Sequence, residues 1–256
     1  MSATLPERTL KMVILQIQEF FALAARSLIR VFSPPFYYRE FATQFEKIGF
    51  DSLFIISLTG LFTGMVMALQ ALIQLKPFAA TSSVGSMVAV TMIKELGPVL
   101  ASLMVAGRVG SAITAEIGTM MVTEQVDAMR VEGTDIIKRL VTPRLKAAVL
   151  AMPMLAIVTD AVSLVGGYLI AATYNINPLM YYKSLPRFMV FQDLVEGVVK
   201  PAVFGFIIAM ISCYVGFSTK GGAEGVGTSA KRAVVLSSVL ILVTDFFITK
   251  IFIAFR

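Results

Sequence analysis

Residues 94–133 read KELGPVLASLMVAGRVGSAITAEIGTMMVTEQVDAMRVEG, and this stretch determines how the rest of the chain is arranged. It begins inside an apolar segment with two adjacent charges, Lys94 and Glu95, and ends as a short charged piece. The Gly97-Pro98 pair predicts a helix break directly after those charges, because proline cannot donate a helical hydrogen bond. Small residues then recur every four positions, at Ser102, Ala106, Gly110, Thr114 and Gly118. This spacing predicts a groove along one face of a membrane helix, where another backbone can approach closely.

The composition is that of an integral membrane protein. Hydrophobic residues make up 57% of the 256 residues, charged residues 15%, and the mean hydropathy is +0.83. A soluble domain of this length could not keep so much apolar surface out of water. The chain has no histidine and one cysteine, Cys213, which excludes an internal disulfide, metal sites built on histidine or cysteine clusters, and histidine-dependent proteases. The basic residues form no aromatic-interleaved patch, so nucleic-acid binding is not indicated.

Five apolar stretches are each long enough to cross about 30 Å of hydrocarbon. They are continuous rather than alternating, which indicates helices and an all-α membrane protein. The predicted spans are 48–75, 85–115, 147–173, 194–217 and 233–255. Together they form one five-span domain, 48–256.

The N-terminal region, 1–47, differs in character from the spans. Its residues 9–32 are apolar but repeatedly interrupted by charged and amide side chains. This pattern favours a helix lying in the membrane interface over one that crosses it. A soluble amphipathic arm is the alternative. No cleavable signal peptide is expected from the first residues.

Lysine and arginine residues predict the orientation. Segments 1–47, 116–146 and 218–232 carry fourteen of them, whereas 76–84, 174–193 and the tail from Lys250 carry five. Cytoplasmic loops hold the excess of basic residues, so we expect the N-terminus inside and the C-terminus outside.

Two of the predicted cytoplasmic loops carry recognisable patterns. Thr123 can cap a short helix that Gly133 closes, and this 123–133 segment is either a helix facing a partner or a solvated loop. Residues 218–232 form a glycine-rich loop. They lack the G-x-x-x-x-G-K-[ST] pattern, so this chain is not expected to bind ATP itself.

Charges inside the spans suggest function because burying them in lipid is expensive. Lys94 and Glu95 point about 100° apart on a helix, so they cannot face each other. Glu95 could face a cavity, or a headgroup region through Lys94, or each could pair with a residue of another helix. Arg108 is expected to bond carbonyls or Glu116 near the cytoplasmic boundary.

Two other functions compete with simple packing of these charges. Asp160 and Asp245 stand in different spans, as in aspartyl intramembrane proteases, but both lack the Gly-x-Gly-Asp signature. With Glu95 and Glu196 they could relay protons in a secondary carrier driven by an ion gradient. The five spans show no inverted repeat, which argues against a carrier. A purely structural anchor would need no groove and no charged span.

The opening stretch also carries a family resemblance. Its E-L-G-P, A-G-R-x-G-S-A, T-A-E-I-G and E-Q elements stand in the order found in the MlaE/YrbE permease family, the membrane subunits of MCE-associated ABC transporters. The resemblance extends from about Gly60 through the last apolar segment, and four elements in register over about forty residues make it specific.

The resemblance implies a transport subunit with no catalytic residue, metal or cofactor of its own. Members are homodimers in the Gram-negative inner membrane. Each protomer pairs with a cytoplasmic ABC ATPase (MlaF-like), which binds ATP and magnesium and can carry a small STAS-domain protein (MlaB-like). The dimer carries a hexameric MCE-domain protein (MlaD-like) on its outer side. The implied cargo is phospholipid, moved between the inner membrane and periplasmic carriers to maintain outer-membrane lipid asymmetry. The implied ATPase-coupling residues, on or near a coupling helix at 124–132 between spans two and three, are Glu116, Glu124, Gln125, Asp127, Met129 and Arg130.

A lipid cargo needs an apolar cavity with a polar rim. We expect this cavity between two protomers, beside the charges of Lys94 and Glu95. Each apolar residue near it could equally face lipid or the protein core. The predicted lining residues are Met67, Leu69, Leu72, Leu75, Phe78, Lys94, Glu95, Leu96 and Val99.

Overall fold

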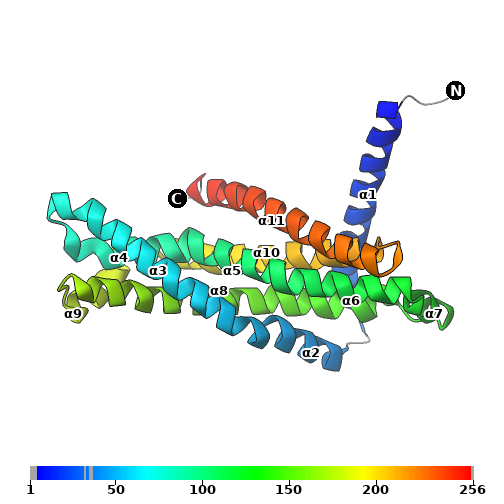
Figure 1. The fold of residues 1–256 in the computed structure, drawn as a ribbon, viewed down its shortest axis with the longest axis horizontal. Coiled ribbons are helices and arrows are strands. Elements are labelled where there is room, and N and C mark those ends of the chain that lie inside the picture. The colour runs from blue at the N-terminus through cyan, green and yellow to red at the C-terminus, as the bar shows by residue number, and fades with distance from the viewer. Residues whose placement is uncertain (1–4, 32, 35–36, 255–256) are drawn as a thin grey trace.

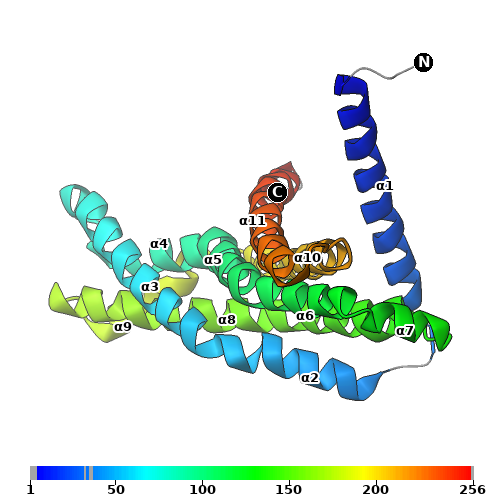
Figure 2. The same ribbon diagram turned by 45° about the vertical axis from the view of Figure 1, so that its right-hand side comes forward.

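A computed structural model describes residues 5–31, 33–34 and 37–254, with the side chains of residues 5–13 and 16 excepted. Within these ranges every regular element is helical. Figures 1 and 2 show an elongated bundle in which the long helices run side by side, while α1 lies across one end. The all-α prediction is confirmed.

The helices follow the predicted order. The main ones are α1 (Leu5–Val31), α2 (Tyr38–Ile48), α3 (Leu53–Leu75), α4 (Val84–Thr91), α5 (Gly97–Val105), α6 (Ser111–Val122), α7 (Gln125–Val131), α8 (Thr142–Thr173), α9 (Pro178–Ser184), α10 (Phe191–Phe217) and α11 (Gly222–Ala254). Short 3₁₀ turns cover Phe50–Ser52, Lys76–Phe78, Thr81–Ser83 and Leu185–Phe188. Wider π-helical turns cover Met92–Leu96, Ala106–Gly110 and Ile137–Val141.

Five helical segments are long and apolar enough to cross a membrane, which confirms the predicted number of spans. They are Tyr38–Phe78, Thr81–Val122, Ile137–Thr173, Phe191–Phe217 and Gly222–Ala254. Residue 255, the predicted end of the last span, lies outside the described residues.

The helix break predicted at Gly97-Pro98 is wrong. The second span continues through the wide turn Met92–Leu96, and α5 begins at Gly97 with Pro98 in its first turn. A wide turn accommodates the missing proline N–H, so the helix needs no interruption.

The groove of small side chains is confirmed, and α10 fills it. All five of its residues are buried. A side chain added at Gly110 would touch Ser212, and one at Gly118 would touch Thr219. Thr114 Oγ1 also donates a hydrogen bond to the carbonyl of Ser212, at 3.2 Å. The groove therefore fixes the distance between α6 and α10.

Glycines also bring α3 and α8 together. A Cβ at Gly60 would lie 2.8 Å from the carbonyl oxygen of Thr159, and one at Gly64 would overlap the carbonyl of Ser163. Gly166 on α8 packs against the Leu61 carbonyl. The Gly-x-x-x-Gly spacing thus marks a real close crossing.

The predicted loop 218–232 is wrong from Gly222 onward. α11 begins there, and only Gly221 and Gly222 of that segment have positive φ angles, 90° and 67°. Gly225 lies inside the helix, where its missing side chain leaves room for the Lys220 carbonyl. Glycine content suggested a loop, but packing of the helix start against that turn overrides the weak local preference.

The short helix in the 116–146 connection exists, with different end residues from those expected. Thr123 does not cap it: its hydroxyl bonds the Thr119 carbonyl, and Glu124 precedes α7 with a φ of 59°. Gly133 closes it as expected, with a φ of 75°. The Thr134 amide then bonds the Met129 carbonyl, which completes a glycine-type C-cap.

The N-terminal helix α1 crosses the end of the bundle that carries α7 (Figures 1 and 2). Ala24 and Ser27 are buried against the bundle, whereas Ile14, Phe21 and Leu28 are exposed on another face. This arrangement fits a helix in the membrane interface, which stays a prediction about the membrane itself. Phe32, the last residue of the predicted segment 9–32, lies outside the described residues.

Candidate functional site

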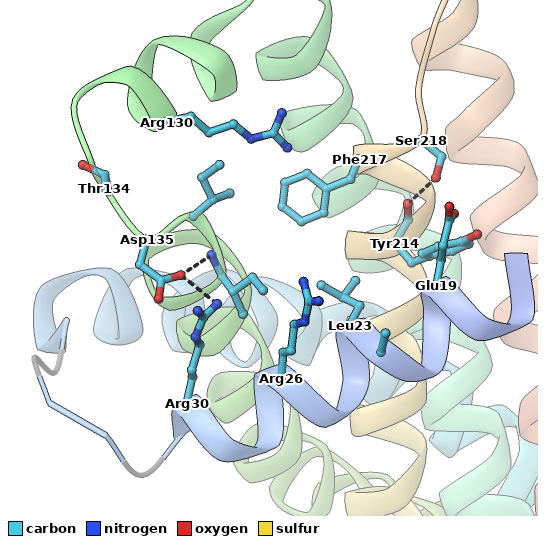
Figure 3. A pocket seen from close by; sticks show the side chains of 13 residues that line it. Glu19, Leu23, Arg26, Arg30, Arg130, Thr134, Asp135, Tyr214, Phe217 and Ser218 are labelled. Carbon is cyan, nitrogen blue, oxygen red and sulfur yellow. Dashed lines mark hydrogen bonds and ion pairs between the residues drawn. The ribbon is translucent and has the colours of Figure 1, made fainter. Parts of the chain in front are cut away.

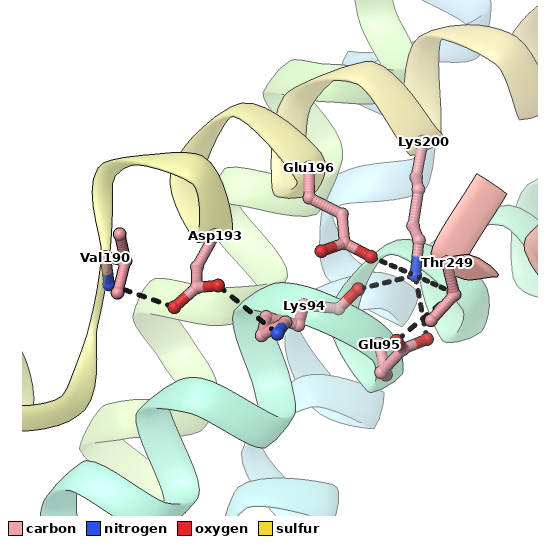
Figure 4. A network of polar contacts seen from close by, with 7 residues as sticks. All are labelled: Lys94, Glu95, Val190, Asp193, Glu196, Lys200 and Thr249. Carbon is pink, nitrogen blue, oxygen red and sulfur yellow. Dashed lines mark hydrogen bonds and ion pairs between the residues drawn. The ribbon is translucent and has the colours of Figure 1, made fainter. Parts of the chain in front are cut away.

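An ion network joins the wide turn Met92–Leu96 to α10 and α11 (Figure 4). Lys94 and Glu95 come from the turn, and two acidic residues and a lysine come from the first turns of α10. Positions 193, 196 and 200 share one helix face because they are separated by three and four residues. The α10 and α11 members are Asp193, Glu196, Lys200, Asp245 and Thr249.

Lys200 lies at the centre of this network and is fully buried. Its ammonium donates hydrogen bonds to Glu95 Oε2 at 2.8 Å, Thr249 Oγ1 at 2.8 Å and the Lys94 carbonyl at 3.0 Å. An ammonium has three hydrogens, so these bonds use all of them. Glu196 Oε1 at 2.9 Å and Asp245 Oδ1 at 3.1 Å then stabilise Lys200 by charge.

The Lys94 carbonyl is free for Lys200 because of Pro98. In a regular helix this carbonyl would accept from the amide four residues later, and proline has no N–H. A lysine from α10 supplies the missing donor instead. The Lys-Glu-Leu-Gly-Pro sequence therefore provides both an acceptor and a carboxylate to one ammonium.

Lys94 turns the other way from Glu95. Its ammonium lies 3.2 Å from Asp193 Oδ1, and the second Asp193 oxygen accepts the backbone amide of Val190 at 2.9 Å. Asp193 therefore holds the start of α10 and pairs with the second span. Of the alternatives considered for Lys94 and Glu95, the structure shows the one in which each pairs with a residue of another helix.

The network has an excess of negative charge and one open side. It joins the two lysines to four carboxylates, those of Glu95, Asp193, Glu196 and Asp245. The Glu95 side chain is 36% exposed, compared with 18% for Asp245 and 4% for Glu196. Glu95 is thus the member of this network best placed to contact a passing polar group.

Asp160 and Asp245 lie in different surroundings, and Glu116 pairs with residues other than Arg108. Asp160 packs against Gly97, where any Cβ would overlap its Oδ1 atom. Asp245 instead pairs with Lys200. Arg108 is exposed, and Glu116 pairs with Lys47 at 2.7 Å and with Arg144 at 2.8 Å. The expected Arg108–Glu116 contact is therefore replaced by one that ties α2 and α8 to α6.

The apolar residues predicted to line a cavity fall into three groups. Leu72 is buried in the protein's own core, and Met67 and Leu96 pack against the same cluster. Val99 packs against the larger core cluster. Leu69 and Phe78 are exposed, at 37% and 79%. Leu75 is half-buried and packs against the same cluster as Met67 and Leu96. Of the apolar set, Leu72 alone is buried, so the role of these residues in lining a space shared with a second protomer stays a prediction.

Leu75 borders a small apolar hollow between the ends of α3 and α4. Its volume is about 300 Å³. The other residues around it come from α4, the turn before it and the turn after α9: Ser83, Ser86, Met87, Val90, Thr91 and Phe188. The sequence did not predict that a residue after α9 would border this hollow, because no sequence pattern shows which part of that connection packs against the second span.

The coupling segment is an exposed helix held by one buried side chain. Val126 is fully buried, whereas Glu124, Gln125 and Asp127 are exposed. Arg130 pairs with Asp127 at 2.7 Å, with both side chains more than half exposed. Met129 is half-buried. The charged face of α7 is therefore exposed at this end of the bundle.

Sequence reasoning missed Asp193 and Thr249 and left Lys200 out of the predicted site. The sequence did contain one signal for them: Asp193, Glu196 and Lys200 are ionisable residues with helical spacing at the start of a span. No sequence signal relates Thr249 to Glu95, 154 residues away, since that contact depends on how α11 packs.

Five apolar helices with ion pairs between them define a multi-pass membrane protein. Comparison with known proteins makes this class an ABC transporter permease. The sequence model described as Permease MlaE matches residues 41–251, and the chain therefore belongs to the MlaE permease family.

Named relatives cover most of the chain. It is 46% identical over 234 residues to a probable ABC transporter permease protein of Rickettsia bellii, covering 91% of this chain and 89% of that one. It is 38% identical over 231 residues to the chloroplastic protein TRIGALACTOSYLDIACYLGLYCEROL 1 of Arabidopsis thaliana, covering 90% and 66%. It is 35% identical over 210 residues to the intermembrane phospholipid transport system permease protein MlaE of Haemophilus influenzae, covering 81% and 80%.

Proposed function

We propose that this chain is the permease subunit of an ABC transporter that moves phospholipid between the inner membrane and periplasmic MCE-domain carriers, and so maintains outer-membrane lipid asymmetry. The observation that carries the proposal is the ion network, whose Glu95 side chain is 36% exposed in a membrane permease whose helices also expose apolar side chains. A lipid needs this combination, since its headgroup is polar and its tails are not. The phospholipid transport named for the Haemophilus influenzae relative supports the same cargo.

The proposed assembly is a homodimer in a Gram-negative inner membrane. Each protomer receives a cytoplasmic ATPase that binds ATP and magnesium, and an MCE-domain hexamer covers the outer face. A STAS-domain protein joins through the ATPase. The exposed charged face of α7, with Glu124, Gln125 and Asp127, supports docking of the ATPase there. Glu116 contributes to coupling indirectly, because its ion pairs hold α6 against α2 and α8.

The network gives ATP-driven motion a way to reach the cargo. Lys200 and its partners join the second, fourth and fifth spans. When the ATPases close, any change in the spacing of these helices changes the exposure of Glu95. A headgroup held there is released toward the MCE carrier as the cavity narrows.

The test is ATP-dependent transfer of a labelled phospholipid from vesicles containing the permease, ATPase and MCE protein. Leu69→Arg should abolish transfer, because a charge blocks the apolar path, while ATP hydrolysis persists. Leu240→Arg, at a similarly exposed position on α11, is the control. Equal transfer by the wild type and Leu69→Arg would refute the cavity placement.

The same vesicles decide between the proposal and an ion-gradient carrier. Membership of an ABC permease family argues against the carrier. Transfer driven by a proton or sodium gradient without the ATPase would overturn the proposed function.

A further inference from the structure

A hollow lies away from the ion network, at the end of the bundle that α1 crosses (Figure 3). Its volume is about 740 Å³, within the range of about 300–1,000 Å³ typical of small-molecule sites. Its lining comes from α1, from α7 and the connection that follows it, and from the end of α10 with Ser218. None of the residues proposed to contact cargo lines it.

Arginines dominate the polar lining of this hollow. Arg26 and Arg30 project from α1, and Arg130 approaches from α7 (Figure 3). Arg30 lies 3.0 Å from Asp135, which also accepts the amides of Ile137 and Lys138 and so caps the next helix. Glu19 is the second acidic lining residue, so three positive charges face two negative ones.

Arg26 is a lining cation of the hollow that has no ion pair with any residue in the described part of the chain. Among the described residues, no carboxylate lies within ion-pair distance of it, and Figure 3 shows its guanidinium directed between α1 and Phe217. Arg130 pairs with Asp127, in an exposed ion pair of the kind that contributes little free energy. A ligand with a compact negative charge would therefore find one guanidinium without a partner and a second that is weakly held.

The position of α1 indicates which anion reaches this hollow. Ile14, Phe21, Leu28 and Ile29 are exposed on its apolar face, and Arg26 falls at the edge of that face, beside Ala22. When an amphipathic helix lies in the interface, residues at this edge are at headgroup depth. Leu23, Tyr214 and Phe217 add an apolar wall suited to a glycerol backbone.

We propose that this hollow binds the phosphate group of an anionic phospholipid of the cytoplasmic leaflet, as a bound ligand and not as cargo. Arginine forks match phosphate oxygens, and basic pockets on the cytoplasmic side of membrane proteins suit anionic headgroups. The bound lipid would connect α1 to the connection that carries α7. The inference does not depend on the nature of the cargo, and its test requires neither ATP nor transfer.

The experiment is native mass spectrometry of the delipidated full-length chain in detergent, titrated with phosphatidylglycerol or phosphatidylethanolamine. The wild type should prefer phosphatidylglycerol. Arg26→Gln should weaken that binding about tenfold, the effect expected from losing a charge-assisted hydrogen bond. Arg26→Lys should restore part of it, and Lys220→Gln, an exposed basic residue on the α10–α11 turn, should leave it unchanged.

A second variant moves the affinity in the opposite direction. Asp135→Asn keeps an N-capping side chain but frees Arg30, so phosphatidylglycerol should bind more tightly. This variant retains the test if Arg26→Gln proves unstable. Unchanged binding in both Arg26→Gln and Asp135→Asn would overturn the proposal.

Two further outcomes identify other occupants. If glycerol 3-phosphate displaces phosphatidylglycerol at equal concentration, the phosphate site is upheld and its source is a soluble ester. If Arg26→Gln loses the ATPase on co-purification while lipid binding is unchanged, the hollow is a protein contact, and the lipid proposal is refuted.

Discussion

Lys200 shows how a single charged residue is accommodated inside a membrane span. Its three hydrogens are used by a carbonyl, a carboxylate and a hydroxyl from two other helices, and two more carboxylates lie within 3.1 Å. Burying such a cation alone would cost several kcal/mol. The network offsets that cost. Its carboxylates in turn rely on Lys200 as their counter-charge.

Removing this lysine should therefore be costly. In Lys200→Met, the carboxylates of Glu95, Glu196 and Asp245 lose their common counter-charge. We expect a loss of about 3–5 kcal/mol, the range found when one partner of a buried pair is removed. Thermal unfolding in detergent measures it.

The exposed ion pair on α7 provides the comparison for that variant. Arg130→Met breaks the pair with Asp127, whose side chain is 57% exposed, and should change the midpoint little. If Lys200→Met unfolded at the wild-type temperature, the network would have no structural role.

For single residues, the sequence predicted that the side chains of Lys94 and Glu95 point in different directions, but not which residues they pair with. The helical angle between neighbours required Lys94 and Glu95 to diverge, and they do. That Asp193 and Lys200 are their partners depends on the rotation of α10 about its axis. Local sequence does not set that rotation.

The elements are assembled through glycine and small residues as much as through apolar bulk. α3 approaches α8 at Gly60 and Gly64, and α6 approaches α10 along the small-residue groove. Four-residue spacing places small residues on one face, so the faces open to close approach could be predicted, but the helices that pack there could not. The early start of α11 could not, since its glycines suggest a loop until their packing is known.

Gly64→Ala tests this dependence on glycine. The added methyl group overlaps the Ser163 carbonyl, and overpacking of this kind costs about 1–3 kcal/mol. Gly107→Ala is the matched control, because nothing lies within 4 Å of its added Cβ. We expect the control to be neutral or more stable by up to about 1 kcal/mol. Equal unfolding midpoints for the two variants would argue against a close crossing of α3 and α8.

The docking role of α7 is tested by reversing its charges. The double variant Asp127→Arg with Arg130→Glu keeps an ion pair within the helix but exchanges the positions of its positive and negative charges. It should fold normally and lose the ATPase on co-purification. Retention of the ATPase at the wild-type level would place the docking surface elsewhere.

For the whole molecule, hydropathy was sufficient to predict five spans, because each crosses the membrane as one apolar helix. Orientation remains a prediction from the basic residues. The interior arrangement could not be read from hydropathy, since helices that are apolar all round give no indication of which face meets which neighbour.

Cysteine labelling tests the orientation. Cys213 is fully buried, so Cys213→Ala gives a background without cysteine. Lys76→Cys and Lys220→Cys then place single thiols at exposed positions on opposite ends of the bundle. An impermeant thiol reagent should label position 76 in intact spheroplasts and position 220 only after permeabilisation. The reverse pattern would invert the predicted topology.

The wide turn Met92–Leu96 has a consequence for how this chain can vary. Such a turn contains one residue more than a regular helical turn, which offsets the angular phase of everything beyond it by about 100°. Substitutions at these positions change one side chain. Deleting a single residue here would rotate α5 and α6 together and direct the small-residue groove away from α10. In this turn of the second span, the number of residues therefore matters for packing independently of their identity.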